Sequence, residues 1–366
     1  MSITSNQEKK MAFLDIKNVR VVGMATAVPK NIVHNSDAKI DGNDVDKFIE
    51  QIGVGERRKS MSLTAADLQV SAAERMLSDL QWEKDSVDAI LSVSISPDYP
   101  LPVNACMLQD RLGLSRECYA QDICLGCSGW VYGLSVIATL LRDGNIKRGL
   151  LVTGDSKMHW GKGREALLFG HAACVTALEY EPGSEGFKFE FGTDGSNYDA
   201  IIMPKSGLRN LHYDEEMIKQ FEDPFMQHSM EAEMKSLDVF SFSISRVPES
   251  ISTLCDHFGV DFQACDYLVL HQANKSINQH ICKKMMVDPG KAPSSLERFG
   301  NTLSSSIPVT ISTQLKGKVE NKKTNFICCG FGVGLSWASV VFSTEHLVLS
   351  DLVEVDDHFY DDLKWV

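Results

Sequence analysis

Apolar positions along the first half of the chain follow two spacings, which predict strands separated by helices. Short runs of small and branched apolar residues, bounded by glycine, proline or charged residues, are typical of buried strands. Residues 65–80 carry apolar side chains at helical spacing after Thr64, a residue type that caps helices. Further helices are predicted at 44–52, 104–112 and 131–141, and strands at 19–28, 88–94, 149–154 and 172–179. This alternation indicates an α/β fold.

The second half of the chain repeats the order of the first half. Strands predicted at 266–271, 326–330 and 338–343 correspond in turn to those at 88–94, 150–154 and 175–179. The small-residue turn and helix from Gly300 onward correspond to the turn at Cys127 and the helix that follows it. The recurrence predicts two similar halves with mixed sheets, and it places Cys127 and Asn301 near the axis that relates them.

We divide the chain into four parts from this repeat. They are an N-terminal half at 13–203, a segment outside the repeat at 204–235, a C-terminal half at 236–346 and an acidic tail at 347–366. The second part is acidic and rich in methionine, and it is predicted to cover a cleft, with a solvated pair of surface helices as the alternative. The tail is either a flexible end or a small docking element, and the sequence leaves both open.

Charge and cysteine content narrow the class of protein. The formal net charge is -13, and no block of basic residues offsets it, so nucleic acid is not an expected partner. Hydrophobic residues make up 43% of the chain, which is enough for a substantial core. Ten cysteines spread over 366 residues are typical of reduced thiols. We recognise no signal peptide and no membrane span, so the expected location is the cytoplasm.

Cys127 is the candidate nucleophile. It lies in Gln121-Asp-Ile-Cys-Leu-Gly-Cys-Ser-Gly-Trp130, where small residues allow a tight turn from a strand into a helix. At the positive end of a helix dipole, the thiolate is favoured over the thiol. The alternative is a buried structural cysteine. Cys124 and Cys127 also form a C-x-x-C pair, but no second pair of zinc ligands accompanies it.

Three further features complete a candidate site for acyl transfer. His271 ends a predicted buried strand, Asn301 lies in a small-residue turn, and residues 330–337 form a glycine-rich turn. Backbone amides in such a turn can approach a reacting carbonyl closely. A thiol, an imidazole, a carboxamide and free amides are the groups that covalent acyl transfer needs. A papain-like hydrolase uses similar groups, but its signature has an aromatic residue directly after the nucleophile, where this chain has Ser128.

Four motifs in the same order resemble the β-ketoacyl-acyl-carrier-protein synthase III family, condensing enzymes of the thiolase superfamily. They are Cys127-Ser-Gly-Trp130, His271-Gln-Ala-Asn274, Gly300-Asn-Thr302 and Gly330-Phe-Gly-Val-Gly-Leu-Ser-Trp337. The likeness extends from about residue 19 to residue 342. The resemblance implies a homodimer with a thiolase-like, duplicated five-layer α/β/α/β/α fold, in agreement with the internal repeat.

The resemblance also implies an activity, the decarboxylating condensation of an acyl thioester with malonyl-acyl carrier protein to give a 3-oxoacyl thioester. Cys127 would accept the acyl group from acyl-coenzyme A or acyl-carrier protein. His271 Nε2 and the Asn301 amide would bind the enolate oxygen that decarboxylation forms. The backbone amides of Cys127 and Val333 would form the oxyanion hole. No metal and no other cofactor is implied.

Residues that bind the substrate and the carrier follow from the same resemblance. The substrate positions are Leu101, Phe169, Leu237, Asn274 and Phe331, and the carrier-docking positions are Lys275, Lys283 and Lys284, for which a solvated face is the alternative. Lys47 and Gln51 replace the Trp and Arg that hold the coenzyme A nucleotide in the family, and Leu237 replaces an Asn. Leu101 replaces an aromatic residue that closes the acyl pocket of the partner subunit, which predicts room for a longer or branched acyl group.

Two other functions remain open from the sequence. An acyltransferase of the same fold would pass the acyl group to a hydroxyl or an amine in specialised metabolism. A catalytically silent partner subunit would only shape a heterodimer, although the intact set of Cys127, His271 and Asn301 argues against it. Decarboxylation of malonyl-acyl carrier protein would separate condensation from simple transfer.

Overall fold

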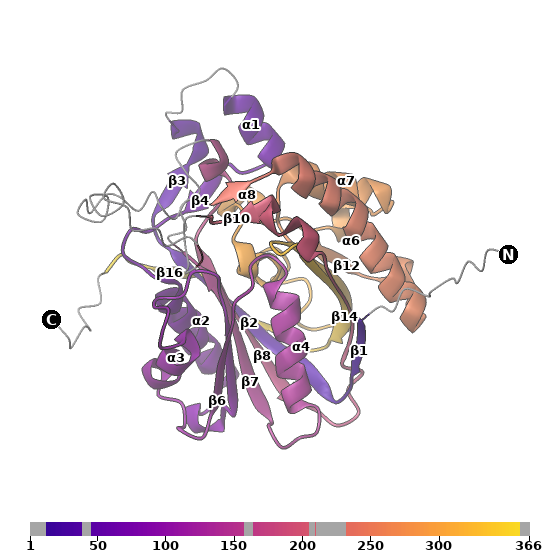
Figure 1. Ribbon diagram of the computed structural model, residues 1–366. Helices are drawn as coiled ribbons and strands as arrows, with labels where there is room; N and C mark the ends of the chain where they lie inside the picture. Colours follow the sequence, from indigo (N-terminus) through magenta and orange to yellow (C-terminus); the bar gives the residue numbers. More distant parts are fainter. Residues whose placement is uncertain (1–11, 39–44, 157–163, 205–208, 210–231, 359–366) are drawn as a thin grey trace.

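The computed structural model describes residues 12–38, 45–156, 164–204, 209 and 232–358. Two large sheets organise this part of the chain, and helices lie between them and on their outer faces (Figure 1). The predicted segment at 204–235 lies almost wholly outside the described residues. Its described end includes β11 (Glu233–Met234), which pairs with β10 (Ile201–Ile202).

The first sheet has seven strands and is built mainly from the N-terminal half of the chain. Its strands are β2 (Val19–Pro29), β5 (Ala89–Val93), β6 (Tyr119–Ile123), β7 (Arg148–Asp155), β8 (Ala172–Tyr180), β15 (Val348–Leu349) and β16 (Val353–Val355). The order is β15-β2-β8-β7-β5-β6, with β16 also paired to β2. β5 runs parallel to β6 and β7, whereas β8 runs antiparallel to β2 and β7, so the sheet is mixed as predicted.

The second sheet has five strands, two of which come from the N-terminal part of the chain. Its strands are β1 (Ala12–Ile16), β9 (Phe187–Thr193), β12 (Tyr267–Leu270), β13 (Thr324–Gly332) and β14 (Ser336–Thr344), in the order β1-β9-β14-β13-β12. β12 and β13 are parallel and the other pairs are antiparallel. β1 and β9 belong to the predicted N-terminal half, 13–203, apart from the first residue of β1, but they pair within the sheet of the C-terminal half. The predicted boundary at residue 203 therefore does not separate the two sheets.

Helices complete five layers. α2 (Ala65–Leu80) and α3 (Asn104–Leu112) pack on the outer face of the seven-stranded sheet. On the far side of the molecule, α6 (Ser236–Phe258) packs on the five-stranded sheet, and α7 (Lys275–Lys284) packs on α6 (Figure 1). α4 (Gly129–Leu141) and α9 (Ser306–Gln314) contact strands of both sheets and form the central layer. The predicted α/β/α/β/α arrangement is confirmed.

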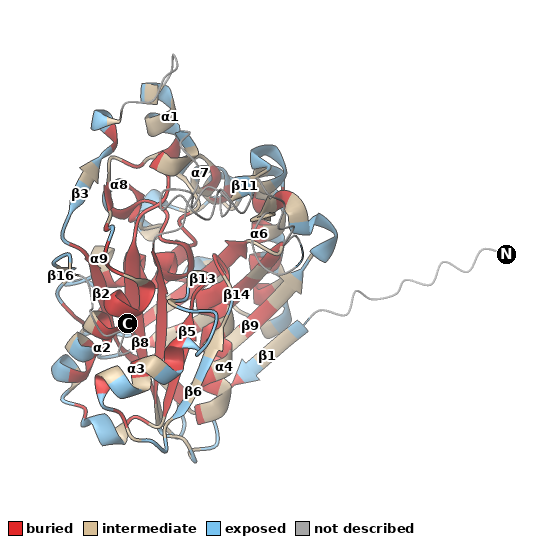
Figure 2. Ribbon diagram, turned by 60° about the vertical axis from the view of Figure 1, so that its left-hand side comes forward, coloured by how far each residue is buried: buried red, intermediate tan, exposed pale blue. Residues whose placement is uncertain are grey.

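Both helices of the central layer are largely buried: α4 is apolar on nearly every face, whereas α9 buries Ser306, Thr310 and Ser312 together with its apolar residues. Figure 2 shows the buried residues concentrated in the two sheets and in the segments between them. Trp130 at the start of α4 is fully buried, and its Nε1 donates to Thr176 Oγ1 on β8 at 3.0 Å. Phe187, Phe326 and Phe342 of the five-stranded sheet belong to the same core cluster as Trp130. One hydrophobic core therefore joins the two halves.

The remaining described elements are short. They are α1 (Val45–Ile52), α8 (Leu296–Phe299), the paired strands β3 (Ile32–His34) and β4 (Glu56–Arg58), and the 3-10 helices η1 (Asn35–Asp37), η2 (Lys84–Ser86), η3 (Arg164–Leu167), η4 (Gly195–Ala200), η6 (Phe262–Ala264), η7 (Pro289–Lys291) and η8 (Leu303–Ser305). No helix in the described ranges is long and apolar enough to cross a membrane.

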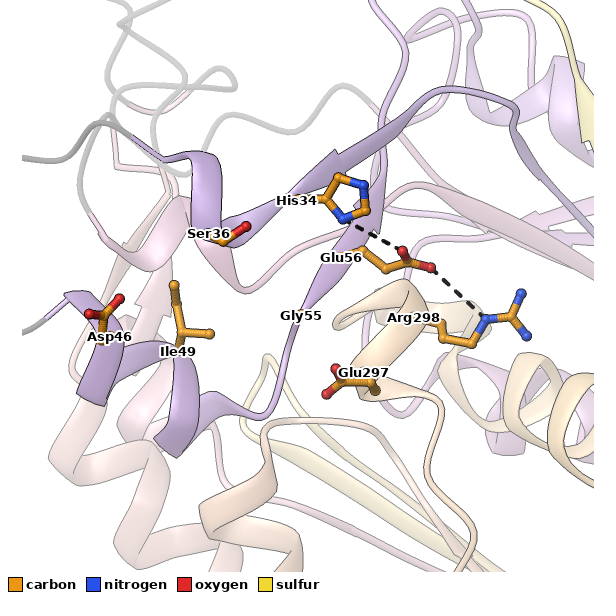
Figure 3. Close-up of a pocket in the computed structure, with 8 residues that line it drawn as sticks. All are labelled: His34, Ser36, Asp46, Ile49, Gly55, Glu56, Glu297 and Arg298. Atoms are coloured by element: carbon orange, nitrogen blue, oxygen red, sulfur yellow. Dashed lines mark ion pairs between the residues drawn. The ribbon is translucent and has the colours of Figure 1, made fainter.

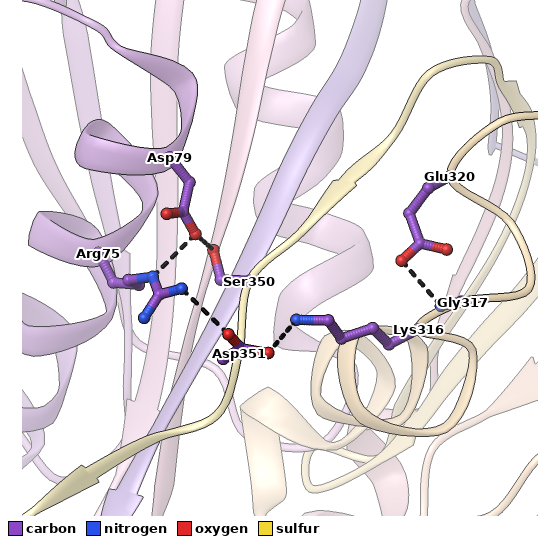
Figure 4. Close-up of polar contacts among 7 residues, drawn as sticks. All are labelled: Arg75, Asp79, Lys316, Gly317, Glu320, Ser350 and Asp351. Carbon is purple, nitrogen blue, oxygen red and sulfur yellow. Dashed lines mark hydrogen bonds and ion pairs between the residues drawn. The ribbon is translucent and has the colours of Figure 1, made fainter.

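The described part of the acidic tail contributes two strands to the seven-stranded sheet. β15 and β16 add to the seven-stranded sheet beside β2, and the Leu347 and Leu349 side chains are buried. Between these strands, Asp351 forms ion pairs with Arg75 of α2 and with Lys316, close to the end of α9 (Figure 4). Asp351 therefore connects α2 of the N-terminal half with the end of α9 in the C-terminal half. The tail is described as far as residue 358, and residues 359–366 lie outside the description.

Candidate active site

A cavity of about 310 Å³ brings together the three predicted catalytic residues, Cys127, His271 and Asn301. All three side chains are buried. Of the predicted substrate and oxyanion residues, Phe169, Leu237, Asn274, Phe331 and Val333 line the same cavity. Leu101 does not line it, and its side chain is 82% exposed just before α3.

Cys127 lies in the turn between β6 and α4, as its small neighbours predicted. The amide of Gly129 donates to the Gly126 carbonyl at 2.8 Å and closes the turn. Glycines of β13 pass so close that no side chain fits. A Cβ on Gly330 would lie 3.0 Å from the Cys127 carbonyl oxygen, and one on Gly332, whose φ is 154°, would lie 2.9 Å from Cys127 Sγ.

The thiol of Cys127 is a weaker acid than the helix start predicted. Burial raises its pKa to about 12 and outweighs a hydrogen bond from the Val333 amide, which favours the thiolate. The carboxylate of Asp155 adds to the rise. Burial therefore opposes the thiolate that the helix start favours, because a buried anion loses its hydration. The bond from Val333 nevertheless brings one predicted oxyanion amide to the sulfur.

His271 follows β12 and is held in one orientation. Its Nδ1 lies 2.6 Å from Ser306 Oγ at the start of α9, and that oxygen also accepts the Gln272 amide at 3.3 Å. With this amide as donor, the Ser306 hydroxyl proton is available for Nδ1, and the ring proton then resides on Nε2. Burial lowers the His271 pKa to about 3. The ring is neutral at pH 7 and can donate through Nε2.

Asn301 is fixed through both its side chain and its backbone. Its Oδ1 accepts the Leu303 amide at 2.9 Å, which defines the position of Nδ2. Nδ2 donates to the Ala273 carbonyl at 3.4 Å, and its second proton is left for another acceptor. The Asn301 amide donates to the Leu168 carbonyl at 2.8 Å, and the Gly170 amide donates to the Asn301 carbonyl at 3.1 Å. The carboxamide therefore has a defined direction within the cavity.

Arg164 and Glu165 are polar residues at the wall of the cavity that were not predicted from the sequence. Arg164 lies over the Phe48 ring, with its guanidinium carbon 5.1 Å from the ring centre, and it pairs with Glu165 at 3.7 Å. All three residues line the cavity, as does Gln51. Phe48 belongs to the apolar face of α1, which was predicted as a helix but not connected with the site.

Asp155 is a further residue that the sequence did not reveal. It is the last residue of β7, it is 1% exposed, and its side chain accepts the Ser304 amide in the turn that carries Leu303. A charged residue at the end of a predicted buried strand was the available signal. The strand was predicted to end at Gly154, one residue before Asp155.

The three predicted docking lysines lie on α7 and are exposed. Lys275 is at the first turn, and its side chain covers Gly53 beside α1, where an added Cβ would lie 2.6 Å from the Lys275 Cβ. Lys283 and Lys284 are in the last turn, and Lys284 Nζ donates to the Ile244 carbonyl at 3.1 Å. The lysines therefore form two separate positive points on one helix.

A second, larger cavity of about 510 Å³ lies between α1 and α8 (Figure 3). Its lining includes the Glu56 carboxylate, which lies 3.7 Å from His34 Nδ1 and 4.0 Å from Arg298 Nε. Neither Cys127 nor His271 lines this cavity. We therefore place the chemistry in the smaller cavity. Within the described ranges, no group of His, Cys, Asp and Glu side chains is arranged to hold a metal ion.

Comparisons with known proteins agree with these observations. Models of the 3-oxoacyl-[acyl-carrier-protein] synthase III family match residues 121–195 and, for its C-terminal part, residues 255–344. The crystal structure of a 3-oxoacyl-(acyl-carrier protein) synthase from Burkholderia xenovorans LB400 is 33% identical, covers 94% of this chain and 99% of its own, and superposes with a TM-score of 0.86.

Curated relatives give the same result over nearly the whole length. The β-ketoacyl-[acyl-carrier-protein] synthase III of Desulfitobacterium hafniense is 28% identical over 333 residues, which are 88% of this chain and 97% of the relative. That of Clostridium perfringens is 26% identical over 331 residues, 89% and 99% of the two chains. The resemblance seen in the four motifs is confirmed, and the chain belongs to the 3-oxoacyl-[acyl-carrier-protein] synthase III family.

Proposed function

We propose that this chain catalyses the decarboxylating Claisen condensation of an acyl thioester with malonyl-acyl carrier protein, giving a 3-oxoacyl thioester. The observation that carries the proposal is the presence of Cys127, His271 and Asn301 in one cavity. The neutral imidazole and the oriented carboxamide are suited to donate to an enolate oxygen.

The first half-reaction transfers the acyl group to the protein. Sγ of Cys127 bonds to the acyl carbon, and the carrier sulfur leaves with the proton that the thiol gives up. The amides of Cys127 and Val333 donate to the oxyanion of the tetrahedral intermediate. The hydrogen bond from Val333 to the sulfur supports this role, because it brings the amide beside the reacting atom.

The second half-reaction forms the carbon–carbon bond. The malonyl carboxylate leaves as carbon dioxide, and its electron pair passes into the enolate, whose oxygen accepts from His271 Nε2 and Asn301 Nδ2. The α-carbon then attacks the acyl carbon on Cys127. The thioester bond to Sγ breaks, the product leaves as a 3-oxoacyl thioester of the carrier, and Sγ takes up a proton.

Transfer of the acyl group to a hydroxyl or an amine is the alternative reaction. Such transfer needs a base that removes the proton of the acceptor. With its pKa lowered to about 3, His271 is a weak base. As a hydrogen-bond donor it remains effective, which favours condensation over simple transfer. Carbon dioxide release from malonyl-acyl carrier protein distinguishes the two reactions.

Intact-protein mass spectrometry tests the first half-reaction. The protein is incubated with matched panels of acyl-coenzyme A and acyl-carrier protein, with Cys127→Ala as the control variant. We expect an acyl adduct on the native chain and none on the variant. An adduct that persists in Cys127→Ala would overturn the assignment of the nucleophile. The absence of an adduct with every thioester would favour the silent-subunit reading.

We further propose that the lysines of α7 dock an acyl carrier protein, whose acidic surface suits Lys275, Lys283 and Lys284. All three are exposed, and Lys275 directly follows Asn274, which lines the cavity. Charge-driven docking weakens with ionic strength. We expect salt to raise the Kd for carrier protein, and Lys275→Ala to reduce this salt dependence. A Kd that is unchanged by salt would contradict docking through these lysines.

A homodimer is part of the same proposal. β6 is an edge strand of the seven-stranded sheet, so its outer backbone groups can pair with a second copy. Leu101, 82% exposed in the single chain, would then close the partner's acyl pocket. We expect Leu101→Phe to narrow the range of accepted acyl chains. An unchanged acyl preference, or a monomer in sedimentation, would contradict this arrangement.

We place the reaction in the cytoplasm. All ten cysteines are unpaired, including the exposed Cys106 and Cys124, which fits a reducing compartment. Fractionation of cells that produce the tagged protein tests this placement, and recovery in an oxidising compartment would contradict it.

A further inference from the structure

A buried carboxylate connects three loops at one end of the seven-stranded sheet. Asp155 ends β7, and its side chain accepts five hydrogen bonds. Oδ1 accepts from the Ile95 amide at 2.9 Å, Ser94 Oγ at 3.1 Å and Ser96 Oγ at 3.3 Å. Oδ2 accepts from the Ser304 amide at 3.1 Å and from Ser304 Oγ at 2.5 Å. The loop after β5 and the turn before α9 are thereby fixed to the end of β7.

The five donors match an ionised carboxylate. Every contact is one in which an oxygen of Asp155 accepts, so protonation would place a hydrogen where a donor already points. The donors are hydroxyls and backbone amides, and no cation pairs with Asp155 among the residues that the structure describes. Burial raises the pKa of this carboxyl, and the hydrogen bonds oppose that rise.

Ser304 connects this carboxylate to Asn301. The amides of Leu303 and Ser304 are consecutive along the chain. Asn301 Oδ1 accepts the first of them at 2.9 Å, and Asp155 Oδ2 accepts the second at 3.1 Å. The orientation of one short turn therefore depends on both side chains. If Asp155 released Ser304, the peptide that orients the Asn301 carboxamide would be free to rotate.

We propose that Asp155 is a positioning residue for the condensation half-reaction, holding the turn through which Asn301 Nδ2 is aimed at the enolate oxygen. Asp155 is not among the residues that line the cavity, so it acts through Ser304 and not on the substrate. The proposal rests on the function proposed above, in which Asn301 serves decarboxylation and not acyl transfer to Cys127.

An amide cannot replace this carboxylate. Asn at position 155 would keep one accepting oxygen and turn an NH₂ group toward either the Ser304 amide or the Ile95 amide. In both orientations two donors would face each other, so either the turn at Ser304 or the loop at Ile95 would have to shift. A misplacement of about 1 Å at a catalytic group lowers a rate about 100-fold.

The test compares both half-reactions in Asp155→Asn. We expect carbon dioxide release from malonyl-acyl carrier protein to fall about 100-fold. Acylation of Cys127 should be retained or become faster, because removal of the carboxylate charge favours the thiolate. A role in folding alone would lower both rates together. Ser304→Ala, which removes the hydroxyl and keeps the amide, is expected to show a smaller loss in the same direction.

Glu190→Gln is the matched control. Glu190 is a fully buried carboxylate on β9 of the other sheet, it accepts from the Ser250 hydroxyl, and it does not line the cavity. We expect this variant to lower stability without changing the ratio of the two half-reactions. Equal carbon dioxide release in Asp155→Asn and the native chain, or a parallel loss of both half-reactions, would overturn the inference.

A spectroscopic readout separates failure of this inference from failure of the proposed function. The side-chain amide resonance of Asn301 can be assigned by its loss in Asn301→Asp. We expect this resonance to shift in Asp155→Asn and to stay in place in Glu190→Gln, whether or not malonyl thioester is a substrate. An unshifted resonance would overturn the positioning role. A native chain that releases no carbon dioxide would overturn the proposed function instead.

Discussion

The turns that precede the two central helices occupy equivalent places in the two halves, yet they are stabilised in opposite ways. The turn at Cys127 leads into α4, and the turn at Asn301 leads through η8 into α9. Both are built from small residues. Glycine backbone packs tightly against the first turn, whereas hydrogen bonds from buried side chains hold the second.

The difference reflects what each turn must do. The turn at Cys127 has to lie close to β13, because the Val333 amide that follows β13 donates to the sulfur, and Gly330 and Gly332 make this close approach possible. The donors of the second turn act only in a defined direction, so Asn301 is oriented by a backbone amide and His271 by Ser306. Close approach depends on the absence of side chains in the first turn, and direction depends on polar side chains in the second.

The largest test of this contrast is Gly332→Ala. The new Cβ would lie 2.9 Å from Cys127 Sγ at a φ of 154°, so the sulfur or the Val333 amide must move. We expect the acylation rate, measured by mass spectrometry, to fall at least about 100-fold. Gly195→Ala is the control, because nothing lies within 4 Å of its added Cβ. Native acylation in Gly332→Ala would show that close backbone packing is not required at the sulfur.

The second test concerns the protonation of the thiol. Because burial raises the pKa of Cys127 to about 12, the thiolate fraction grows with pH throughout the usual range. We expect the iodoacetamide alkylation rate of Cys127 to rise about tenfold per pH unit between pH 7 and 10. Peptide mass spectrometry separates this site from the exposed Cys106 and Cys124. A rate that levels off near pH 7 would mean that the helix N-terminus outweighs burial.

A smaller effect is expected from Ser306→Ala, which removes the hydroxyl beside His271 Nδ1. The loss of one neutral hydrogen bond, about 1 kcal/mol, corresponds to about a fivefold lower rate of malonyl decarboxylation. Acylation should not change. Ser305→Ala is the control on the same turn, because Ser305 Oγ donates to the Ala172 carbonyl and not to the site. Equal losses in the two variants would indicate a packing defect and not a loss of histidine orientation.

Local sequence patterns predicted the helices that have clear capping residues. They also predicted the site residues that lie at the ends of strands or the starts of helices. Thr64 caps α2 through a reciprocal bond with Asp67, as its residue type predicted, and Gly113 ends α3 in a left-handed conformation directly after the predicted helix 104–112. Cys127, His271 and Asn301 were found because each follows a strand or begins a helix. Their meeting in one cavity follows from the repeat of the two halves.

The features that were missed depend on contacts between distant segments. α6 continues through Pro248, a residue that usually ends a helix, because Val247, Ile251 and Leu254 are buried in a core cluster that also includes residues of the five-stranded sheet. β9 pairs with β14, far along the chain, and a local pattern does not reveal that partner. The contacts of Asp155 likewise join three loops that the sequence alone does not bring together.

The smallest expected effect is on thermal stability and concerns the tail. An exposed ion pair links the tail to other elements, whereas buried contacts hold both turns. Asp351 is 72% exposed and pairs with Arg75 of α2 and with Lys316. Exposed ion pairs contribute little, so we expect Asp351→Asn to lower Tm by no more than about 2 °C at pH 7. The hydrogen bond from Lys316 lowers the pKa of the Asp351 carboxyl. Its contribution is therefore present above the unfolded pKa of about 4 and is lost as pH falls through the lower folded value.

Thermal melts at pH 7 and pH 3, at low and high salt, check this prediction. The difference in Tm between Asp351→Asn and the native chain should shrink at pH 3 and at high salt. Asp143→Asn is the control, because Asp143 pairs with its neighbour Arg142 and joins no separate elements. A Tm loss well above the expected size would mean that the ion pair holds β15 and β16 on the sheet. The pairing of these strands with β2 and the burial of Leu347 and Leu349 would then be insufficient by themselves.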